Sequence, residues 1–419
     1  MKKPELLSPA GDLERLKVAF AYGADAVYMG GKTLGMRAKA KNFEMGEMAE
    51  GVKYAHSLGK KIYITANIVA HNEDFDGMEA YFCELERMKV DALIVSDLGI
   101  FSVAKKVVPS MEIHVSTQAN ATNYMSINAW KQFGANRVVL ARELSIAEIA
   151  EISQKTQGIA LEAFIHGSMC MSYSGRCLIS NYMSNRDANR GGCSQPCRWS
   201  YQLLEEKSGE TLPIYETERG TYIMSSKDLC MIQYIPQVIN AGITSFKIEG
   251  RMKTSYYVGA VTKAYRQAID DYFQDPALYE SRKDYYQAQL DRVSHRAYTT
   301  GFYFGPMTAA DHSYGGDSMA KTHDFLAIVE DYDPATGMAS IEQRNKFSLG
   351  DTIEILHAQN RPIENGENQL QAHIQTVSVL TDENNIPIQS APHPKQKLRL
   401  KVDVPVSPFD IIRKAAHAE

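Results

Sequence analysis

The sequence predicts an α/β protein: a TIM-like (β/α)8 barrel with a cysteine-rich insertion, followed by a small C-terminal all-β barrel domain. The barrel is predicted because short β-rich runs alternate with longer amphipathic segments up to about residue 257, and eight such runs can be counted. The second domain is predicted because the pattern changes near residue 321 to short alternating strands separated by turn residues.

The eight predicted strands occupy residues 5–8, 26–29, 62–65, 92–95, 112–115, 137–140, 160–164 and 245–248. Gly23, Gly134 and Gly242 each stand just before one of these strands, where a helix C-cap is expected. Parallel strands joined by helical crossovers close into a barrel, so residues 1–300 are assigned to the first domain. Residues 301–320 are expected to form a linker, and residues 321–410 the small β-barrel.

The remaining elements follow from local periodicity. Helices are expected at 257–273 and 278–293, and strands of the second domain at 325–329, 338–341, 352–355 and 397–402. The residues from Ile411 onward are expected to be a loosely ordered tail.

Composition narrows the class of protein. The chain has 419 residues, 44% hydrophobic and 23% charged, with only short apolar runs and no apolar leader after Met1. We therefore expect a cytoplasmic protein with no membrane contact. The net charge of −5 is mildly acidic, so any nucleic-acid contact must come from a local basic surface.

Polar residues gather where the predicted strands end, which in a barrel is the catalytic face. They are Asn67, Ser96, Gln118, Glu143, Glu162, His166, Glu249 and Arg251. His166, Glu162 and Glu249 are the catalytic candidates, with His166 serving as a proton donor or substrate ligand. A carboxylate inside the barrel needs a cation, and Arg176 or Arg251 is the expected partner of Glu162. Each of these polar residues could instead cap the following helix.

Five of the six cysteines fall between residues 170 and 230: Cys170, Cys177, Cys193, Cys197 and Cys230. They lie in an insertion at 165–243, between the seventh and eighth strands, and a loop of roughly seventy residues in a compact domain is usually functional. Thiol-rich sites select zinc or iron-sulfur clusters, and the irregular spacing, without C-x-x-C pairs, favours iron-sulfur. The remaining cysteine, Cys83, is expected to be a buried structural thiol.

Two motifs in this region, E-x-F-x-x-G-S-M-C at 162–170 and G-x-C-x-x-S at 175–180, resemble the signature of peptidase family U32, the collagenase-like proteins. The segments LSPAG at 7–11, YMGG at 28–31 and KIEGRMK at 247–253 are similar to that family as well. The resemblance therefore extends over the whole chain.

The resemblance implies a 4Fe-4S cluster held by Cys170, Cys177, Cys193 and Cys230, with Cys197 as the alternative ligand. It also implies oxygen-independent hydroxylation of the wobble uridine of tRNA to 5-hydroxyuridine, with prephenate as the hydroxyl donor. One barrel with a single short C-terminal domain is typical of the tRNA-modifying branch. The implied partners are tRNA, the small carboxylate co-substrate and a paralogous chain of the same family.

A dicarboxylate such as prephenate requires guanidinium or amide donors. Arg142, Arg176, Arg251, Asn67 and Gln118 are the candidates near the barrel mouth, and Arg37 is a further one.

For RNA, the insertion offers Arg190 and Arg198 as phosphate ligands and Trp199 as a stacking surface. The same loop could instead only wrap the cluster and shield it from water.

Two other functions stay open. A collagenase-like peptidase would need an activated nucleophile, and His166 with Ser168 or Cys170 could form a dyad, although neither G-x-S-x-G nor H-E-x-x-H occurs. A non-catalytic scaffold or RNA chaperone would bind RNA without modifying it.

Overall fold

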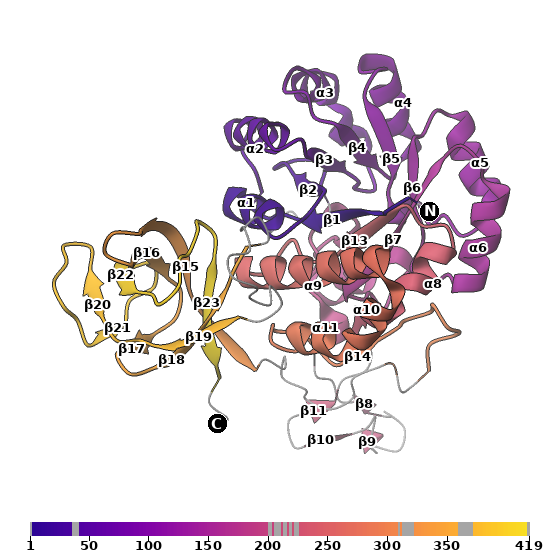
Figure 1. Ribbon diagram of the computed structural model, residues 1–419. Helices are drawn as coiled ribbons and strands as arrows, with labels where there is room; N and C mark the ends of the chain where they lie inside the picture. Colours follow the sequence, from indigo (N-terminus) through magenta and orange to yellow (C-terminus); the bar gives the residue numbers. More distant parts are fainter. Residues whose placement is uncertain are drawn as a thin grey trace.

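The computed structural model describes residues 2–35, 42–199, 226–308, 311, 322–358 and 372–416, and the backbone alone of residues 203–204, 211–212, 216–217 and 220–221. These residues form a large barrel domain and a smaller β domain that lies beside helix α9 (Ser255–Gln274) (Figure 1).

The large domain is a closed ring of eight parallel strands. The strands pair in chain order, and β13 pairs with both β1 and β7, which closes the ring. They are β1 (Glu5–Pro9), β2 (Ala26–Gly30), β3 (Lys61–Ala66), β4 (Ala92–Val95), β5 (Glu112–Val115), β6 (Arg137–Val139), β7 (Ala160–Ser168) and β13 (Ser245–Ile248). The predicted TIM-like barrel and all eight of its strands are confirmed.

Helices surround this ring. They are α1 (Leu13–Ala21), α2 (Met45–Ser57), α3 (Met78–Arg87), α4 (Leu98–Val107), α5 (Tyr124–Gln132), α6 (Ile146–Lys155), α8 (Ile235–Asn240) and α9. Polar side chains cap the N-termini of several of these helices. Asp97 accepts hydrogen bonds from two amides of α4, and Ser145 and Glu148 form the capping box of α6. Gly23, Gly134 and Gly242 follow helices with φ of +102°, +96° and +93°, as the predicted C-caps require. No helix of the described residues is long and apolar enough to cross a membrane.

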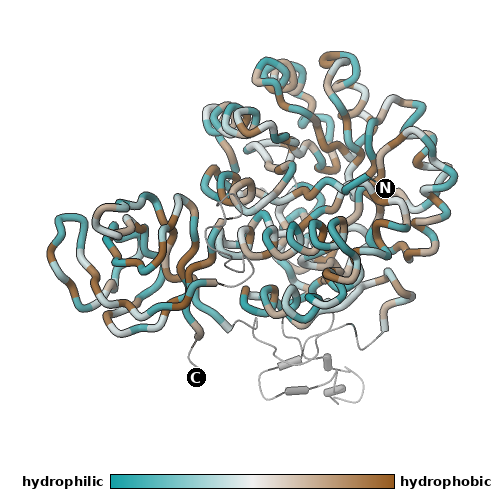
Figure 2. Tube along the Cα trace, in the orientation of Figure 1, coloured by the Kyte–Doolittle hydropathy of each residue, from teal (hydrophilic) through white to brown (hydrophobic). Residues whose placement is uncertain are grey.

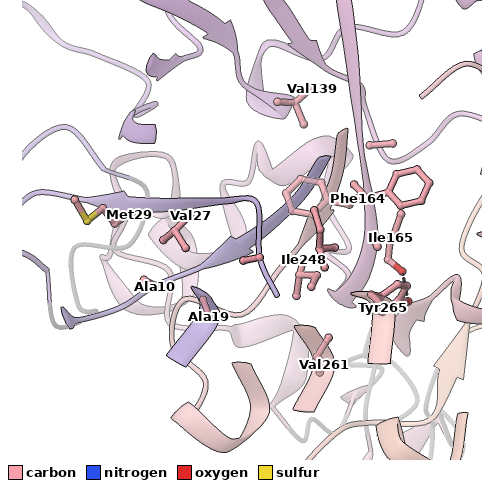
Figure 3. Packing of buried hydrophobic residues seen from close by; sticks show 14 of the residues in the cluster. Ala10, Ala19, Val27, Met29, Val139, Phe164, Ile165, Ile248, Val261 and Tyr265 are labelled. Carbon is pink, nitrogen blue, oxygen red and sulfur yellow. Dashed lines mark hydrogen bonds between the residues drawn. The ribbon is translucent and has the colours of Figure 1, made fainter. Parts of the chain in front are cut away.

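The main core lies between the strands and the helices. Apolar segments run along the strands while hydrophilic segments dominate the outer helical surface (Figure 2). Ile165 and Ile248 of the ring pack near Val261 and Tyr265 of α9 (Figure 3), and all four belong to one buried cluster. A second, smaller cluster, to which Tyr28, Tyr63 and Ile94 belong, comes from the barrel strands.

The insertion begins later than predicted. Strand β7 continues to Ser168, because β12 (Asp228–Cys230) pairs antiparallel with its last residues, and β14 (Tyr298–Thr299) pairs with β12. Residues 165–168 therefore belong to the barrel wall, and α8 is the ordinary crossover helix into β13. Within the insertion, α7 (Ile179–Ser184) and three 3-10 turns are described.

The predicted second helix after the barrel is two helices, α10 (Pro276–Ser281) and α11 (Lys283–Leu290), which meet at Arg282. Most of the predicted linker at 301–320 lies outside the described residues.

The C-terminal domain is all-β, as predicted. Its main sheet has seven strands in the order β19-β18-β23-β15-β16-β22-β20, wrapped around its own apolar cluster. The strands are β15 (His323–Asp333), β16 (Met338–Gln343), β18 (Thr352–Leu356), β19 (His373–Thr376), β20 (Leu380–Asp382), β22 (Lys397–Lys401) and β23 (Ile411–Ala415). The expected loose tail is wrong up to Ala415, because β23 hydrogen-bonds to both β15 and β18 and buries Ile411 and Ile412.

Candidate functional site

A cavity opens at the carboxyl end of the barrel strands. Its wall consists of Tyr28, Thr65, Asn67, Ile94, Ser116, Thr117, Gln118, Val139, Arg142, Phe164, Lys247, Glu249 and Arg251. Five predicted site residues therefore come together in it: Asn67, Gln118, Arg142, Glu249 and Arg251. Predicting the barrel from the sequence was sufficient to find them, because the carboxyl ends of parallel strands converge.

Arg251 lies across one side of the cavity and is only 5% exposed. Its Nη2 donates to Asn42 Oδ1 at 2.6 Å and its Nη1 to Thr65 Oγ1 at 3.3 Å. A side chain at Gly30 would place its Cβ 2.5 Å from Nη2, so the glycine leaves room for the guanidinium.

Arg142 occupies another side of the cavity. Its Nη1 donates to the carbonyl of Ser168 at 3.1 Å, and its guanidinium lies 4.0 Å from the centre of the Phe164 ring. A guanidinium held in this way keeps its other N–H groups in a fixed orientation for a planar acid group.

The amides form a small network beside the arginines. Asn67 Nδ2 donates to Ser116 Oγ and to Gln118 Oε1, both at 3.1 Å. Glu249 is the one carboxylate among the described residues of the wall, and its Oε2 accepts from the Ser168 amide at 3.4 Å. With Lys247, the described wall carries three cations and one carboxylate, which favours an anionic ligand.

Glu162 lies inside the barrel but does not line the cavity. It is fully buried, and its carboxylate contacts Arg137 Nη1 at 2.9 Å and Lys247 Nζ at 2.7 Å. Burial raises its pKa, but the charges of these two cations outweigh burial and bring the pKa to about 2. The expected pairing of Glu162 with Arg176 or Arg251 is wrong, and a permanently ionised, paired carboxylate below the cavity is not placed for catalysis.

His166 also lies away from the cavity. The β7–β13 register shifts beside it, and Gly167, at φ +108°, leaves space where a Cβ would lie 2.5 Å from the Glu249 carbonyl. The imidazole is 1% exposed and packs among the rings of Tyr257, Tyr265 and Tyr298, with centroids 5.4 to 5.9 Å away. Burial lowers its pKa to about 3, so it stays neutral. The predicted catalytic role of His166 is not supported by this position.

The insertion crosses the carboxyl face of the barrel and is tied to three strand-end loops. The backbone N and the Oγ of Ser174 both donate to Glu143 at 2.6 Å, and Arg176 Nε donates to the Gln118 carbonyl at 2.9 Å. The amide of Val69 donates to the Asn189 carbonyl at 3.0 Å. Residues 169–199 therefore lie next to the cavity mouth, with the exposed Arg176 at its rim.

Four cysteines of the insertion lie close together. Burial raises the pKa of Cys197, Arg198 lowers it, and the charges of Cys170, Cys193 and Cys177 raise it further, which requires all three to be near Cys197. Cys193 Sγ accepts a hydrogen bond from the Gln195 amide at 3.4 Å, a contact that stabilises a thiolate ligand.

Cys230 lies in β12, paired with His166 of β7. It is buried in β12, where Tyr265 Oη donates to its sulfur at 3.8 Å, and burial raises its pKa to about 12. Burial raises the pKa of Cys197 as well, so the direction of the shift does not separate the two thiols. Which of Cys230 and its alternative Cys197 completes the ligand set stays a prediction, and the two thiols differ in that Cys230 is buried and Cys197 half-buried. Cys83, expected to be buried, is half-buried on α3.

The donor set formed by Cys170, Cys177, Cys193 and Cys197 fits a 4Fe-4S cluster, which takes four thiolates. Within the described ranges, no group of three or more His, Cys, Asp or Glu side chains is close enough for a single metal ion. Each thiolate of a cluster binds a different iron, so its ligands stand further apart than those of one ion.

The predicted RNA ligands differ in availability. Arg190 pairs with Glu73 at 2.8 Å and Asp74 at 2.7 Å, and Arg198 is largely enclosed, donating to the Gln195 side chain and the Met169 carbonyl. Trp199 is exposed, as are Tyr173 and Tyr182 of the same segment, which the sequence interpretation did not single out. Arg37 lies outside the described residues.

Comparison with known proteins gives consistent matches. Residues 11–313 match Peptidase family U32, and residues 321–413 match the Peptidase family U32 C-terminal domain. The chain is 42% identical to tRNA hydroxylation protein P1 of Bacillus subtilis, over 99% of this chain and 95% of that protein. It is 36% identical to tRNA hydroxylation protein P of Escherichia coli, over 88% and 90% of the two chains. A collagenase of Porphyromonas gingivalis is 32% identical, over 94% and 97%. Since both domain matches and these alignments extend over nearly the whole sequence, the chain belongs to peptidase family U32.

Proposed function

We propose that this chain is an RNA-modifying enzyme that hydroxylates the wobble uridine of tRNA to 5-hydroxyuridine without molecular oxygen. In this proposal a 4Fe-4S cluster is held by Cys170, Cys177, Cys193 and Cys197, and prephenate supplies the hydroxyl group. The observation that carries it is the position of a cavity lined by Arg142, Lys247 and Arg251 at the barrel mouth, beside the segment that contains these four cysteines.

The cavity suits a small acid. Arg142 is held by a contact of its own, so it offers its remaining guanidinium N–H groups without reorganisation, and the fixed guanidinium of Arg251 adds a second positive charge. The amide of Gln118 and the hydroxyl of Ser116 add neutral hydrogen-bonding groups. A dicarboxylate bound there would be oriented by both arginines, and Glu249 would disfavour a third acid group beside them.

The cluster, when bound, would supply redox or Lewis-acid chemistry next to the cavity. The chain's own residues would do the rest: the insertion covers the cavity mouth and limits water, and Glu249 offers a proton acceptor at the cavity wall.

RNA would approach from the outer side of the insertion. Tyr182 is 90% exposed, Tyr173 53% and Trp199 40%, and such rings stack on unpaired bases. An anticodon loop offers unpaired bases, which supports a loop as the substrate. The names of the two tRNA hydroxylation relatives support the same class of reaction.

A peptidase is the second candidate, favoured by the collagenase among the relatives. Its dyad would require His166 to reach Ser168 or Cys170. The imidazole instead contacts Tyr265 Oη at 3.3 Å from Nδ1 and is enclosed by tyrosines, with its Nε2 unpartnered in the described part of the chain. The geometry therefore favours hydroxylation over peptide cleavage.

Nucleoside mass spectrometry of tRNA tests the proposal. A strain deleted for this gene and for any paralogue should lose 5-hydroxyuridine and its derivatives, and the wild-type gene should restore them while Cys197→Ala should not. Gelatin cleavage by the same purified proteins is the parallel assay. Unchanged tRNA in the deletion strain, or gelatin cleavage that survives removal of iron, would contradict the proposed function.

A further inference from the structure

Lys247 is a buried cation in the cavity wall that no step above uses. It lies within β13, four residues before Arg251, and is 4% exposed. We propose that its ammonium group is a substrate ligand that binds one carboxylate of a small dicarboxylate at the floor of the cavity. The inference deepens the proposed function, on which it rests for the identity of that acid.

The hydrogen bonding of Lys247 is incomplete. An ammonium group has three N–H donors, and within the described residues its one hydrogen-bond acceptor is Glu162 Oε1, at 2.7 Å. Because Lys247 lines the cavity, its other two N–H donors can be satisfied by an acceptor in the cavity. Buried donors without acceptors are costly, so an acceptor supplied by a ligand is expected there.

The surroundings hold the ammonium in place. Glu162 is itself fixed by Arg137 Nη1, which also contacts Glu5 Oε1 at 2.6 Å. The rings of Tyr28 and Phe164 flank the ammonium, with centroids at 4.6 and 5.5 Å. Glu162 and Arg137 are thus positioning residues, and Lys247 is presented to the cavity without loss of side-chain freedom on binding.

The depth of Lys247 indicates an acid with two separated charges. Arg251 follows the end of β13 and Arg142 follows the end of β6, whereas Lys247 lies inside its strand and therefore deeper in the barrel. A molecule with one carboxylate at the arginines and a second toward the floor would use all three cations. Among the residues that the structure describes, Glu249 is the one carboxylate of the wall against these three cations.

The alternative is a purely structural lysine that neutralises Glu162. Two variants separate the roles. Lys247→Met keeps the aliphatic stem but leaves Glu162 short of a cation, while Lys247→Met with Glu162→Gln restores charge balance. If Lys247 only neutralises Glu162, the double variant should recover ligand binding. If Lys247 binds the ligand directly, the double variant should not recover it.

Calorimetric titration of the full-length, anaerobically purified protein tests this with prephenate and with phenylpyruvate, which carries a single carboxylate. Both variants should bind prephenate about ten- to a hundred-fold more weakly than wild type, the cost of a lost charged hydrogen bond. The matched control is Lys253→Met, which removes another largely enclosed lysine of the same motif whose Nζ bonds the Ser294 carbonyl outside the cavity wall. It should bind prephenate as wild type does.

Wild-type affinity in the folded double variant would overturn the assignment, and so would a wild-type chain that binds neither acid. The RNA function is tested separately, by measuring 5-hydroxyuridine in the tRNA of the deletion strain. Loss of 5-hydroxyuridine there, together with unchanged acid binding in both variants, would reject Lys247 while keeping the proposed function. If the deletion strain keeps its 5-hydroxyuridine but both Lys247 variants bind prephenate more weakly, the proposed tRNA function is rejected and Lys247 remains a ligand of the acid.

Discussion

Cys197 and Cys230 differ in what surrounds each thiol. Cys197 lies among three other cysteines and beside Arg198, whereas Cys230 is enclosed by the barrel wall and hydrogen-bonded by Tyr265. Sequence spacing treats the two as equivalent candidates, because it carries no information on which thiol faces the others. The proposed function uses Cys197 because it lies in the same segment as the other three cysteines, whereas Cys230 lies in the barrel wall.

Cysteine substitution should therefore give a clear asymmetry. Cys197→Ala should remove most of the iron and acid-labile sulfide from anaerobically purified protein, because the cluster loses a ligand. Cys230→Ala should retain both, since the cluster does not use that sulfur. Iron and sulfide analysis is the measurement, and the opposite pattern would return Cys230 to the ligand set.

His166 should matter for acid stability and not for catalysis. Its pKa is about 3 in the folded protein against about 6.5 unfolded, so between these values the unfolded chain binds a proton that the folded one does not. The contribution of the neutral ring to the free energy of unfolding is therefore greatest above pH 6.5. It falls as the pH drops toward 3, by up to about 1.4 kcal/mol per pH unit.

His166→Phe keeps the ring packing and removes this titration. Denaturant unfolding measured from pH 7 to 4 should show a shallower loss of stability than wild type, with tRNA hydroxylation retained. Loss of hydroxylation in a folded, iron-replete variant would restore His166 to the catalytic site.

At the scale of elements, the important feature is how the insertion is attached to the barrel. Strand β7 is longer than the other barrel strands, and β12 pairs with its extension, so both ends of the insertion start from the wall. Glu143 then holds the segment from the loop after β6 through two bonds to Ser174. These contacts fix the thiols beside the cavity.

Glu143→Ala should loosen the insertion without unfolding the barrel. Each lost bond to a charged group is worth about 1.5–3 kcal/mol, which is enough to open a short segment. Limited proteolysis within 169–199 should become faster and iron content should fall, while the main thermal transition is retained. Glu151→Ala, which removes an exposed ion pair with Lys155 on α6, is the control and should change neither measurement.

At the scale of the whole molecule, Arg413 joins the two domains. It is fully buried on β23, where its Nε donates to Glu354 at 2.8 Å within the β domain. Its Nη1 donates to Tyr256 Oη of α9 at 3.1 Å and its Nη2 to Gln289 Oε1 of α11 at 3.2 Å. One guanidinium therefore satisfies partners in both domains, which couples their stability.

Arg413→Met should cost about 1.5–3 kcal/mol, because it removes a charged hydrogen bond from the half-buried Glu354 and breaks the interdomain bonds. Denaturant unfolding should show an earlier transition, separated from that of the barrel. Arg399→Met on the exposed side of β22 is the control and should leave the curve unchanged. An unaltered unfolding midpoint in Arg413→Met would show that the domains are held together by other contacts.

Local and periodic patterns in the sequence were sufficient to predict the eight strands, their helices, the all-β second domain and the cysteine-rich insertion. The sequence also located Asn67, Gln118, Arg142, Glu249 and Arg251, because strand ends converge in any parallel barrel. Tertiary structure decided what depends on the direction of a side chain. A register shift beside Gly167 accompanies the burial of His166 among tyrosines, and Glu162 points below the cavity to Lys247 and Arg137. It also placed Cys230 in the barrel wall beside Tyr265, an environment that spacing along the chain does not reveal.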